Sequence, residues 1–482
     1  MVELAGTVAL AYLGALVAGL SGVRRPAARV ALALPLGVAV YVVTLLVLLV
    51  VGVPVPPVVA LGLPIGALTV VVARRRPDQL GWGLGAAAVY GLMMVAVRLL
   101  AFPRVSPDSF RYVEAGAILR DSRSLDDLTG PLALTRQFTY PAIQALAAPG
   151  SYVRTFSALA LVSAVAIVLV AARDALGDAM PPPAISLLVV AAVLTPNRAA
   201  YHALYINGHT LFAALLAIVT AAAWIAWKRP EAAGRWWLAA SLATAALVPL
   251  RPEAVLVAGF ALLPWVLAPA VPLAWRRAPM VALGATTILW YGGGPLRLEL
   301  AAGRDPDTSV VLAVVLGAAT LVATAIAPLW WLPWSLLRRV VVAGSLAGTL
   351  VLAVLRTDEV LASVRATVEN LTGAGYWGWF WPATAVLLAL AWHRRPDAWG
   401  ILVWPIATFP VLGLAVAIAR DAPYRVGAGD SFSRMLVHLL PVVALAFLAR
   451  FEQPVDPGGK GPGSGAAPQR VGAGDAPPGP VH

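Results

Sequence analysis

The sequence predicts an all-α protein, a polytopic transmembrane helical bundle of about 15 spans. Of its 482 residues, 60% are hydrophobic and only 12% are charged, which is about half the charged share of a typical soluble domain. The mean hydropathy is +0.83. Apolar runs near the ~20 residues that cross the hydrocarbon core recur along the chain, whereas a membrane β-barrel would show short alternating segments.

Each predicted span is an apolar window that we interpret as one helix. The windows fall near residues 4–22, 30–53, 57–73, 82–102, 152–172, 182–196, 208–227, 236–250, 254–273, 279–295, 309–334, 339–355, 376–392, 399–419 and 435–449. The first window resembles a signal peptide, but its basic residues follow the apolar run, so a first span is the better prediction. Residues 453–482 are rich in Gly, Pro, Ala and Ser and are predicted to form a disordered tail.

Basic residues gather in the short connections between alternate spans. The clusters are Arg24-Arg25 with Arg29, Arg74-Arg75-Arg76, Lys228-Arg229 with Arg235, Arg276-Arg277, Arg338-Arg339 and Arg394-Arg395. On this span order they share one side, which the positive-inside rule makes cytoplasmic. The other side also carries arginines, dispersed among Asp and Glu. We therefore expect a multi-pass protein of a bacterial-type plasma membrane, with the N-terminus outside and the C-terminus, including the tail, in the cytoplasm.

Composition also excludes several classes of site. Cysteine is absent, so there are no disulfides or thiolate metal sites, and the five histidines show no HExxH-type spacing. The formal net charge is +12. Because most basic residues lie between spans, topology explains this charge and no nucleic-acid partner is expected.

The longest polar interruption before the tail is residues 104–154, the first large loop on the predicted extracytoplasmic side. Pro107 favours a helix start with Ser106 as its cap. Asp108 then lies in the first turn of a short helix on the membrane surface, where the helix dipole favours a carboxylate. Such a carboxylate can accept a proton from a sugar hydroxyl, or it can simply cap a surface helix.

Helical spacing groups the neighbours of this residue. Asp108 and Tyr112 are four apart and share a face, as do Phe110 and Glu114. Arg111 adds a cation to the same surface helix. Arg111, Tyr112 and Glu114 are therefore candidate substrate contacts.

Two arginines lie at predicted outer helix mouths, where an anionic lipid headgroup would dock. Arg251 and Arg434 each offer a planar fork of donors and keep their charge when partly buried. Each also has a simpler interpretation, as a snorkelling anchor or as the ion-pair partner of Glu253 or Asp430.

Histidines and a tyrosine cluster on the same predicted side. His202, Tyr205 and His209 can line a substrate site, and His438 lies in the segment that opens the last span. The pair Asn207-Gly208 also predicts an ordinary turn before a span.

The remaining candidates are weaker. Asp126 and Asp127 can hold a divalent ion such as Mg²⁺ or Mn²⁺, although a solvated acidic pair explains them as well. No other cofactor is expected. Tyr376, Trp377 and Trp379 can stack on sugar rings or can belong to an interfacial aromatic belt.

Three of these elements, in this order, resemble the GT-C superfamily of polytopic glycosyltransferases, which use polyprenyl-phosphate sugars and include mannosyl- and arabinosyltransferases. The run Pro107-Asp108-Ser109-Phe110-Arg111-Tyr112 is similar to the start of their first outer loop, which carries an acidic general base. The run Leu250-Arg251-Pro252-Glu253-Ala254 resembles their Arg-Pro-Glu element, and residues 431–441 resemble the late Arg-then-Pro segment that opens a final span. The similarity covers roughly residues 82–450 in layout.

The resemblance implies an inverting hexosyl- or pentosyltransferase that acts at the extracytoplasmic face. Asp108 would be the base, Arg251 and Arg434 would bind the donor phosphate, and Glu253 and His438 would lie near the substrate. The expected partners are a polyprenyl-phosphate-linked sugar, a cell-envelope glycan, lipid or protein as acceptor, and membrane lipids.

The resemblance also implies a division of the chain. In the commoner GT-C layout the acidic loop follows the first span, whereas here it follows the fourth. Residues 1–81 would therefore be additional N-terminal spans, and residues 82–452 would form the catalytic core.

Two other classes stay open. A transporter or flippase for a lipid-linked or anionic substrate would carry polar groups near mid-bilayer and paired repeats with broken helices, but few charges fall within the spans and no clear repeat is present. A non-catalytic membrane assembly protein would use the outer loops to bind a partner.

Overall fold

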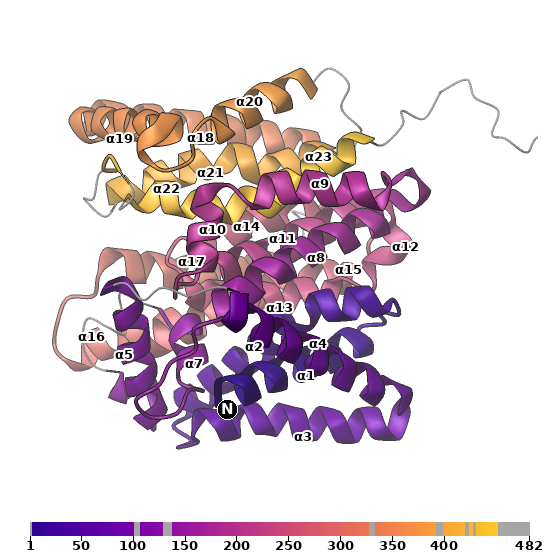
Figure 1. The fold of residues 1–482 in the computed structure, drawn as a ribbon. Coiled ribbons are helices and arrows are strands. Elements are labelled where there is room, and N and C mark those ends of the chain that lie inside the picture. The colour runs from indigo at the N-terminus through magenta and orange to yellow at the C-terminus, as the bar shows by residue number, and fades with distance from the viewer. Residues whose placement is uncertain are drawn as a thin grey trace, which may run out of the picture.

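The computed structural model of the chain describes residues 2–100, 107–128, 137–326, 333–391, 399–419, 424–427 and 430–451. Within these ranges all regular secondary structure is helical, as predicted, and no strand occurs. The long helices run roughly parallel or antiparallel, and the short elements gather at two opposite ends of the bundle, with α5, α16 and α22 toward one end and α12 toward the other (Figure 1).

The elements follow one another along the chain in two halves. The first half contains α1 (Val2–Leu20), α2 (Pro26–Val51), α3 (Pro57–Arg75), α4 (Asp78–Leu100), α5 (Pro107–Asp121), η1 (Leu125–Asp127), α7 (Thr139–Gln144), α8 (Phe156–Leu176), η2 (Gly177–Ala179), α9 (Pro183–Leu194), α10 (Asn197–Ala203) and α11 (His209–Lys228). The second half contains α12 (Pro230–Ala233), α13 (Trp237–Leu247), η3 (Val248–Leu250), α14 (Ala254–Val266), α15 (Leu273–Thr287), η4 (Ile288–Leu296), α16 (Arg297–Ala301), α17 (Thr308–Ile326), α18 (Trp334–Leu355), α19 (Thr357–Glu369), η6 (Asn370–Ala374), α20 (Phe380–Ala391), α21 (Trp399–Ala419), α22 (Ser431–Met435), η8 (Leu436–Leu439), α23 (Leu440–Leu448) and η9 (Ala449–Phe451).

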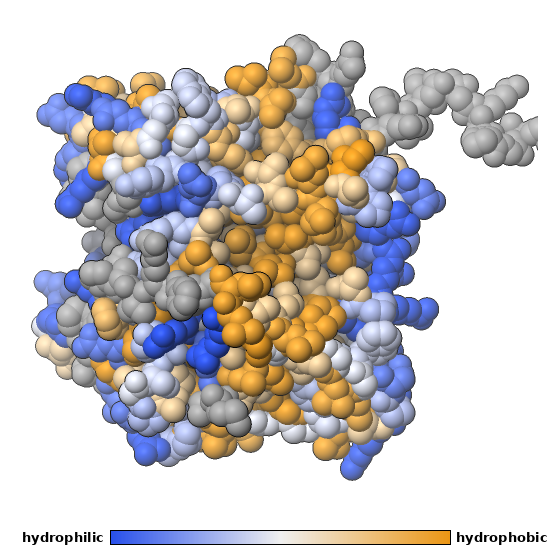
Figure 2. Space-filling view, in the orientation of Figure 1, coloured by the Kyte–Doolittle hydropathy of each residue, from blue (hydrophilic) through white to orange (hydrophobic). Residues whose placement is uncertain are grey.

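The chain is a multi-pass membrane protein. Among the described residues, nine helices are long and apolar enough to cross a bilayer, and α9 with α10, bent by 83°, would make a tenth. Shorter apolar helices lie at Trp237–Leu250, Ala254–Val266, Phe380–Leu390 and Gly400–Leu414. The visible face carries a broad apolar band flanked by hydrophilic edges at the two ends of the helices (Figure 2), as expected for a protein that satisfies its backbone in helices within lipid.

Helix α11 is the centre of the bundle. In its membrane-spanning window 94% of the residues are buried, and it packs against α8, α13 and α14. Helices α1 and α2 pair closely at two glycines, because an added Cβ on Gly14 would lie 1.7 Å from the Ala33 carbonyl oxygen and one on Gly37 would lie 1.8 Å from that of Leu10. Small residues allow this close backbone approach between membrane helices.

One end of the bundle gathers the predicted basic connections. Arg25 forms an ion pair with Asp174 at 2.9 Å, and the indole of Trp236 donates to the same carboxylate at 3.2 Å. The guanidinium of Arg229 lies against Gly177. The connections that carry Arg25 and Arg229, which were predicted to share a side, therefore both contact the segment 174–177 at the end of α8.

The opposite end gathers the segments that follow α4. The hydroxyl of Thr139 donates to the Ala246 carbonyl at 2.9 Å, and the amide of Phe138 donates to the Pro249 carbonyl at 2.7 Å. These bonds dock the start of α7 onto the junction of α13 and η3.

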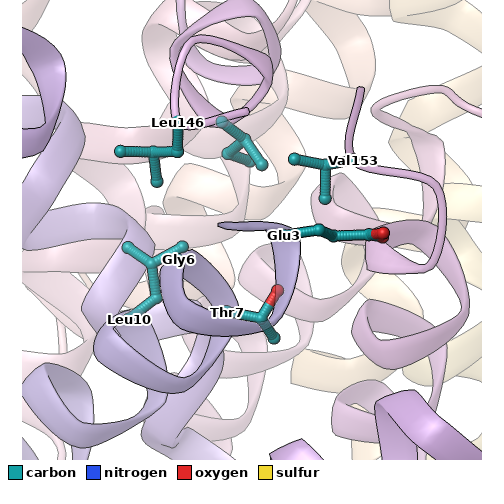
Figure 3. Close-up of a pocket in the computed structure, with 7 residues that line it drawn as sticks. Glu3, Gly6, Thr7, Leu10, Leu146 and Val153 are labelled. Carbon is teal, nitrogen blue, oxygen red and sulfur yellow. The ribbon is translucent and has the colours of Figure 1, made fainter. Parts of the chain in front are cut away.

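Near the same end, Glu3 joins three helices. Its carboxylate pairs with Arg98 at the end of α4 and accepts hydrogen bonds from the amides of Arg154 and Thr155 before α8, at 2.8 and 3.0 Å. The Thr155 hydroxyl donates to it as well, at 2.9 Å. Beside it is a narrow gap, too small for a water molecule, lined by Glu3, Gly6, Thr7, Leu10, Ile143, Leu146 and Val153 (Figure 3).

The predicted spans 339–355 and 376–392 leave a connection between them, and α19 and η6 occupy most of this connection. Helix α19 buries Val360 and Ser363 and exposes Leu361 and Val364. Its apolar residues are interspersed with charged ones, so no apolar run marks the helix in the sequence.

Candidate functional site

The site begins with a turn between α10 and α11. The side-chain amide of Asn207 donates to the carbonyls of His202 and Tyr205 at 3.0 and 2.8 Å. Its carbonyl oxygen accepts from the amide of His209 at 2.8 Å. The predicted turn before the 208–227 span is therefore confirmed, and it brings three predicted site residues together.

A directional hydrogen-bond chain crosses the site. Arg251 Nη1 lies 3.4 Å from His209 Nε2, and His209 Nδ1 lies 3.0 Å from His438 Nε2. Because arginine only donates, His209 Nε2 must accept, so the proton of the neutral His209 ring is on Nδ1 and is donated to His438. The two histidines are almost fully buried.

Arg251 is held from a second direction. Its Nε pairs with the Glu253 carboxylate, which is 6% exposed, while the Arg251 side chain remains 18% exposed. The ion-pair interpretation of this arginine is therefore confirmed. The ion pair also holds the guanidinium group in place at the mouth of the bundle. Because part of the side chain stays exposed, the pairing is compatible with ligand binding.

Two more arginines lie close to the histidines. Arg198, Arg251 and Arg434 are all near enough to His202 to interact with its charge, and Arg198 and Arg434 interact with each other. Arg198 was not a sequence candidate. Its spacing of four residues from His202 could have identified it as a candidate, because residues four apart share a face of a helix.

The segment around Arg434 is fixed by its neighbours. Asp430 caps α22 by accepting from the amide of Ser433 at 2.7 Å. The indole of Trp377 donates to the Ser433 carbonyl and hydroxyl, each at 3.1 Å. Trp377 is buried, so it supports this backbone and is not available to stack on a sugar.

Helix α5 begins at Pro107, as predicted. The side chain of Asp108 lies outside the described residues, but the next residue is placed: the Ser109 hydroxyl donates to the Ile206 carbonyl at 3.3 Å. Tyr112 is buried with its ring centroid 5.2 Å from that of Tyr140. The first turn of α5 is therefore docked on the turn that carries the histidines.

The other candidates on α5 face outward. Arg111 and Glu114 are exposed, whereas Tyr112 is buried. Tyr376 and Trp379 are also exposed, at 63% and 75%.

The acidic pair has a local partner. The Asp127 carboxylate accepts from the amides of Arg123 and Ser124 at 2.5 and 2.8 Å, and these bonds lower its pKa. The side chain of Asp126 lies outside the described residues. Within the described ranges, no group of three or more His, Asp or Glu side chains has metal-binding geometry.

Taken together, one end of the bundle brings three guanidinium groups, three histidine rings and the start of α5 into one place. Guanidinium groups in a partly desolvated site favour the binding of an anion. The chain matches no known family model, no curated protein and no solved structure.

Proposed function

We propose that the chain is a membrane glycosyltransferase of the GT-C type. It transfers a sugar from a polyprenyl-phosphate donor to a cell-envelope acceptor at the extracytoplasmic face. The observation that carries the proposal is the docking of the Asp108–Ser109 turn beside the His209–Arg251 pair. The first turn of α5, to which residue 108 belongs, is thereby docked on the turn that carries His209, although the hydrogen-bonded residues are 97 positions apart in the sequence.

The proposed topology places this end of the bundle outside the cell and the basic connections in the cytoplasm. It has about 15 spans, some of them short and bent, and α5 lies along the outer membrane surface. In this orientation the prenyl tail stays in the lipid while the phosphate reaches the helix mouths.

In the proposed reaction, the acceptor hydroxyl attacks the anomeric carbon of the donor sugar. Its proton passes to the Asp108 carboxylate as the new C–O bond forms. The bond between the anomeric carbon and the phosphate oxygen breaks, and the phosphate leaves with the electron pair. Arg251 and Arg434 stabilise the departing phosphate, an electrostatic contribution that is often the largest in such reactions. The single displacement inverts the configuration.

The test is Asp108→Asn, with Asp121→Asn at the other end of α5 as the matched control. Transfer is measured in nanodiscs with a panel of polyprenyl-phosphate pentoses and hexoses. Loss of a general base typically costs 10²–10⁴-fold. We expect a loss in this range for Asp108→Asn and near-normal transfer for Asp121→Asn. Full activity of Asp108→Asn would remove Asp108 as the base.

A further inference from the structure

His202 has two polar atoms for which the fold supplies no partner. The side chain is fully buried, and neither ring nitrogen has a hydrogen-bond partner among the described residues. The Asn207 side chain lies beside the ring, but its NH₂ group donates to the carbonyls of His202 and Tyr205, its oxygen accepts from the amide of His209, and neither ring nitrogen of His202 reaches it with hydrogen-bond geometry. Because buried polar atoms are nearly always paired, two unpaired atoms on one ring indicate a place for a ligand.

The surroundings determine which kind of ligand fits. Arg198, Arg251 and Arg434 already lie close to the ring, so a protonated His202 would add a fourth positive charge to a buried cluster. A neutral imidazole presents one N–H donor and one acceptor nitrogen. A carboxylate or a fully ionised phosphate can only accept, whereas a hydroxyl group can both donate and accept.

Aromatic rings adjoin these polar atoms. The ring centroids of Tyr201 and Tyr205 lie 5.5 and 5.9 Å from that of His202 and 5.5 Å from each other. Tyr201 is 44% exposed, whereas Tyr205 is buried. A flat apolar surface beside a donor and an acceptor is complementary to a sugar ring, which has apolar C–H faces and hydroxyl groups at its edge.

The position of the ring also fits a donor sugar. The centroids of His202 and His209 are 4.6 Å apart, and His209 contacts Arg251. Only the ring of His209 therefore separates the ring nitrogens of His202 from the Arg251 guanidinium, which we assign to the phosphate. A sugar joined to that phosphate through a single oxygen would lie next to it.

We propose that Tyr201, His202 and Tyr205 form the subsite for the sugar of the donor. The two ring nitrogens of His202 bind two sugar hydroxyls, one as donor and one as acceptor. Tyr201, the exposed outermost ring, turns to admit the sugar and then packs on its apolar face. This proposal rests on the proposed function, because it takes the neighbouring arginines as the phosphate site.

The experiment compares three probes on the full chain in nanodiscs: farnesyl phosphate, farnesyl phosphate carrying one of a panel of pentoses and hexoses, and farnesol. The variant is His202→Phe, which keeps a planar aromatic ring, slightly larger than imidazole, and removes only polar atoms that the fold leaves unpaired. Its thermal stability should therefore equal that of wild type or exceed it. Arg251→Ala is the comparison variant.

Each hydrogen bond contributes up to about tenfold in affinity. We expect wild type to bind one of the sugar phosphates at least about tenfold more tightly than farnesyl phosphate. His202→Phe should bind the two alike, with its affinity for farnesyl phosphate unchanged. Arg251→Ala should weaken both. If His202→Phe fails to fold, Tyr201→Ala, at an exposed ring, serves as the second variant and should lower the same preference.

Three results overturn the proposal. A sugar preference that survives His202→Phe would remove the subsite and leave the proposed function standing. Equal binding of farnesyl phosphate and every sugar phosphate by wild type would do the same. Binding of none of the phosphates, or of farnesol equally well, would refute the proposed phosphate site and the sugar subsite together.

Discussion

Replacing Glu3 should destabilise the protein more than any change at an exposed acid. The carboxylate of Glu3 is 7% exposed and holds the start of α1 against α4 and α8. Glu3→Ala removes the acceptor for two donors of Thr155, its amide and its hydroxyl, and Thr155 is fully buried. The amide of Arg154 loses the same acceptor but belongs to an exposed residue and can bind water.

The magnitude follows from these contacts. Each buried donor left without an acceptor costs about 1–3 kcal/mol. Arg98 is 48% exposed in its pair with Glu3, so solvent screening limits the contribution of that pair to about 1 kcal/mol or less. We therefore expect Glu3→Ala to lower the free energy of unfolding by about 2–7 kcal/mol. Glu3→Gln keeps an acceptor oxygen and should cost only about 1–2 kcal/mol.

The free energies can be measured by equilibrium unfolding in mixed micelles, monitored by tryptophan fluorescence. Glu231→Ala, an exposed acid on α12, is the control and should change stability by no more than about 0.5 kcal/mol. If Glu3→Gln were as damaging as Glu3→Ala, the charge of Glu3 and not its hydrogen bonds would hold the helices. A cost below about 1 kcal/mol for Glu3→Ala would contradict the reasoning about unsatisfied donors.

Three further predictions follow from the site. Trp377→Phe removes the two indole hydrogen bonds to Ser433 and should lower the free energy of unfolding by about 1–2 kcal/mol, measured as above; an unchanged value would mean that these bonds do not hold the segment. In ¹⁵N spectra of histidine-labelled protein, His209 should carry its proton on Nδ1, and in Arg251→Ala both tautomers should be populated. A proton on Nε2 in the wild type would contradict the assigned direction of the hydrogen bonds from Arg251 to His209 and from His209 to His438. The folded-state pKa of Asp127 is lowered by the amide hydrogen bonds from Arg123 and Ser124, so its contribution to stability is present above the unfolded pKa of about 3.9 and is lost as the pH falls through the folded value. The two amide proton shifts should titrate at that lowered pKa in wild type and not in Asp127→Asn, and shifts that do not titrate in wild type would contradict the assignment.

The helical architecture could be predicted because the free energy of transfer into lipid is a sum over the residues of a segment, so an apolar run of sufficient length marks a helix by itself. Every predicted window contains a helix in the structure, and the helix start at Pro107 and the turn at Asn207 were also predictable. Both depend on local chemistry, a fixed φ angle in one case and a short amide side chain in the other. The amphipathic α19 was missed because its apolar residues never form a run.

The candidate site could be predicted only in part. The spacing of Arg198 and His202 was visible in the sequence. The sequence did not show that Arg251 and Arg434 lie close to the same histidine. Trp377 was predicted as a binding or interfacial ring, and its hydrogen bonds to Ser433 give it a different role. Residues 56 positions apart meet there, and no local pattern carries that information.

The two most different helices of the bundle should also have different evolutionary histories. In the membrane-spanning windows of α11 and α18, 94% and 0% of the residues are buried. Nearly every substitution in α11 must keep both volume and shape, whereas α18 must only remain apolar. In a saturation scan, α18 should accept exchanges among Leu, Val, Ile, Ala and Phe that α11 rejects. Distant relatives of this chain are therefore best sought with α11 and the turn before it as the query, since α18 can diverge beyond recognition while the fold persists.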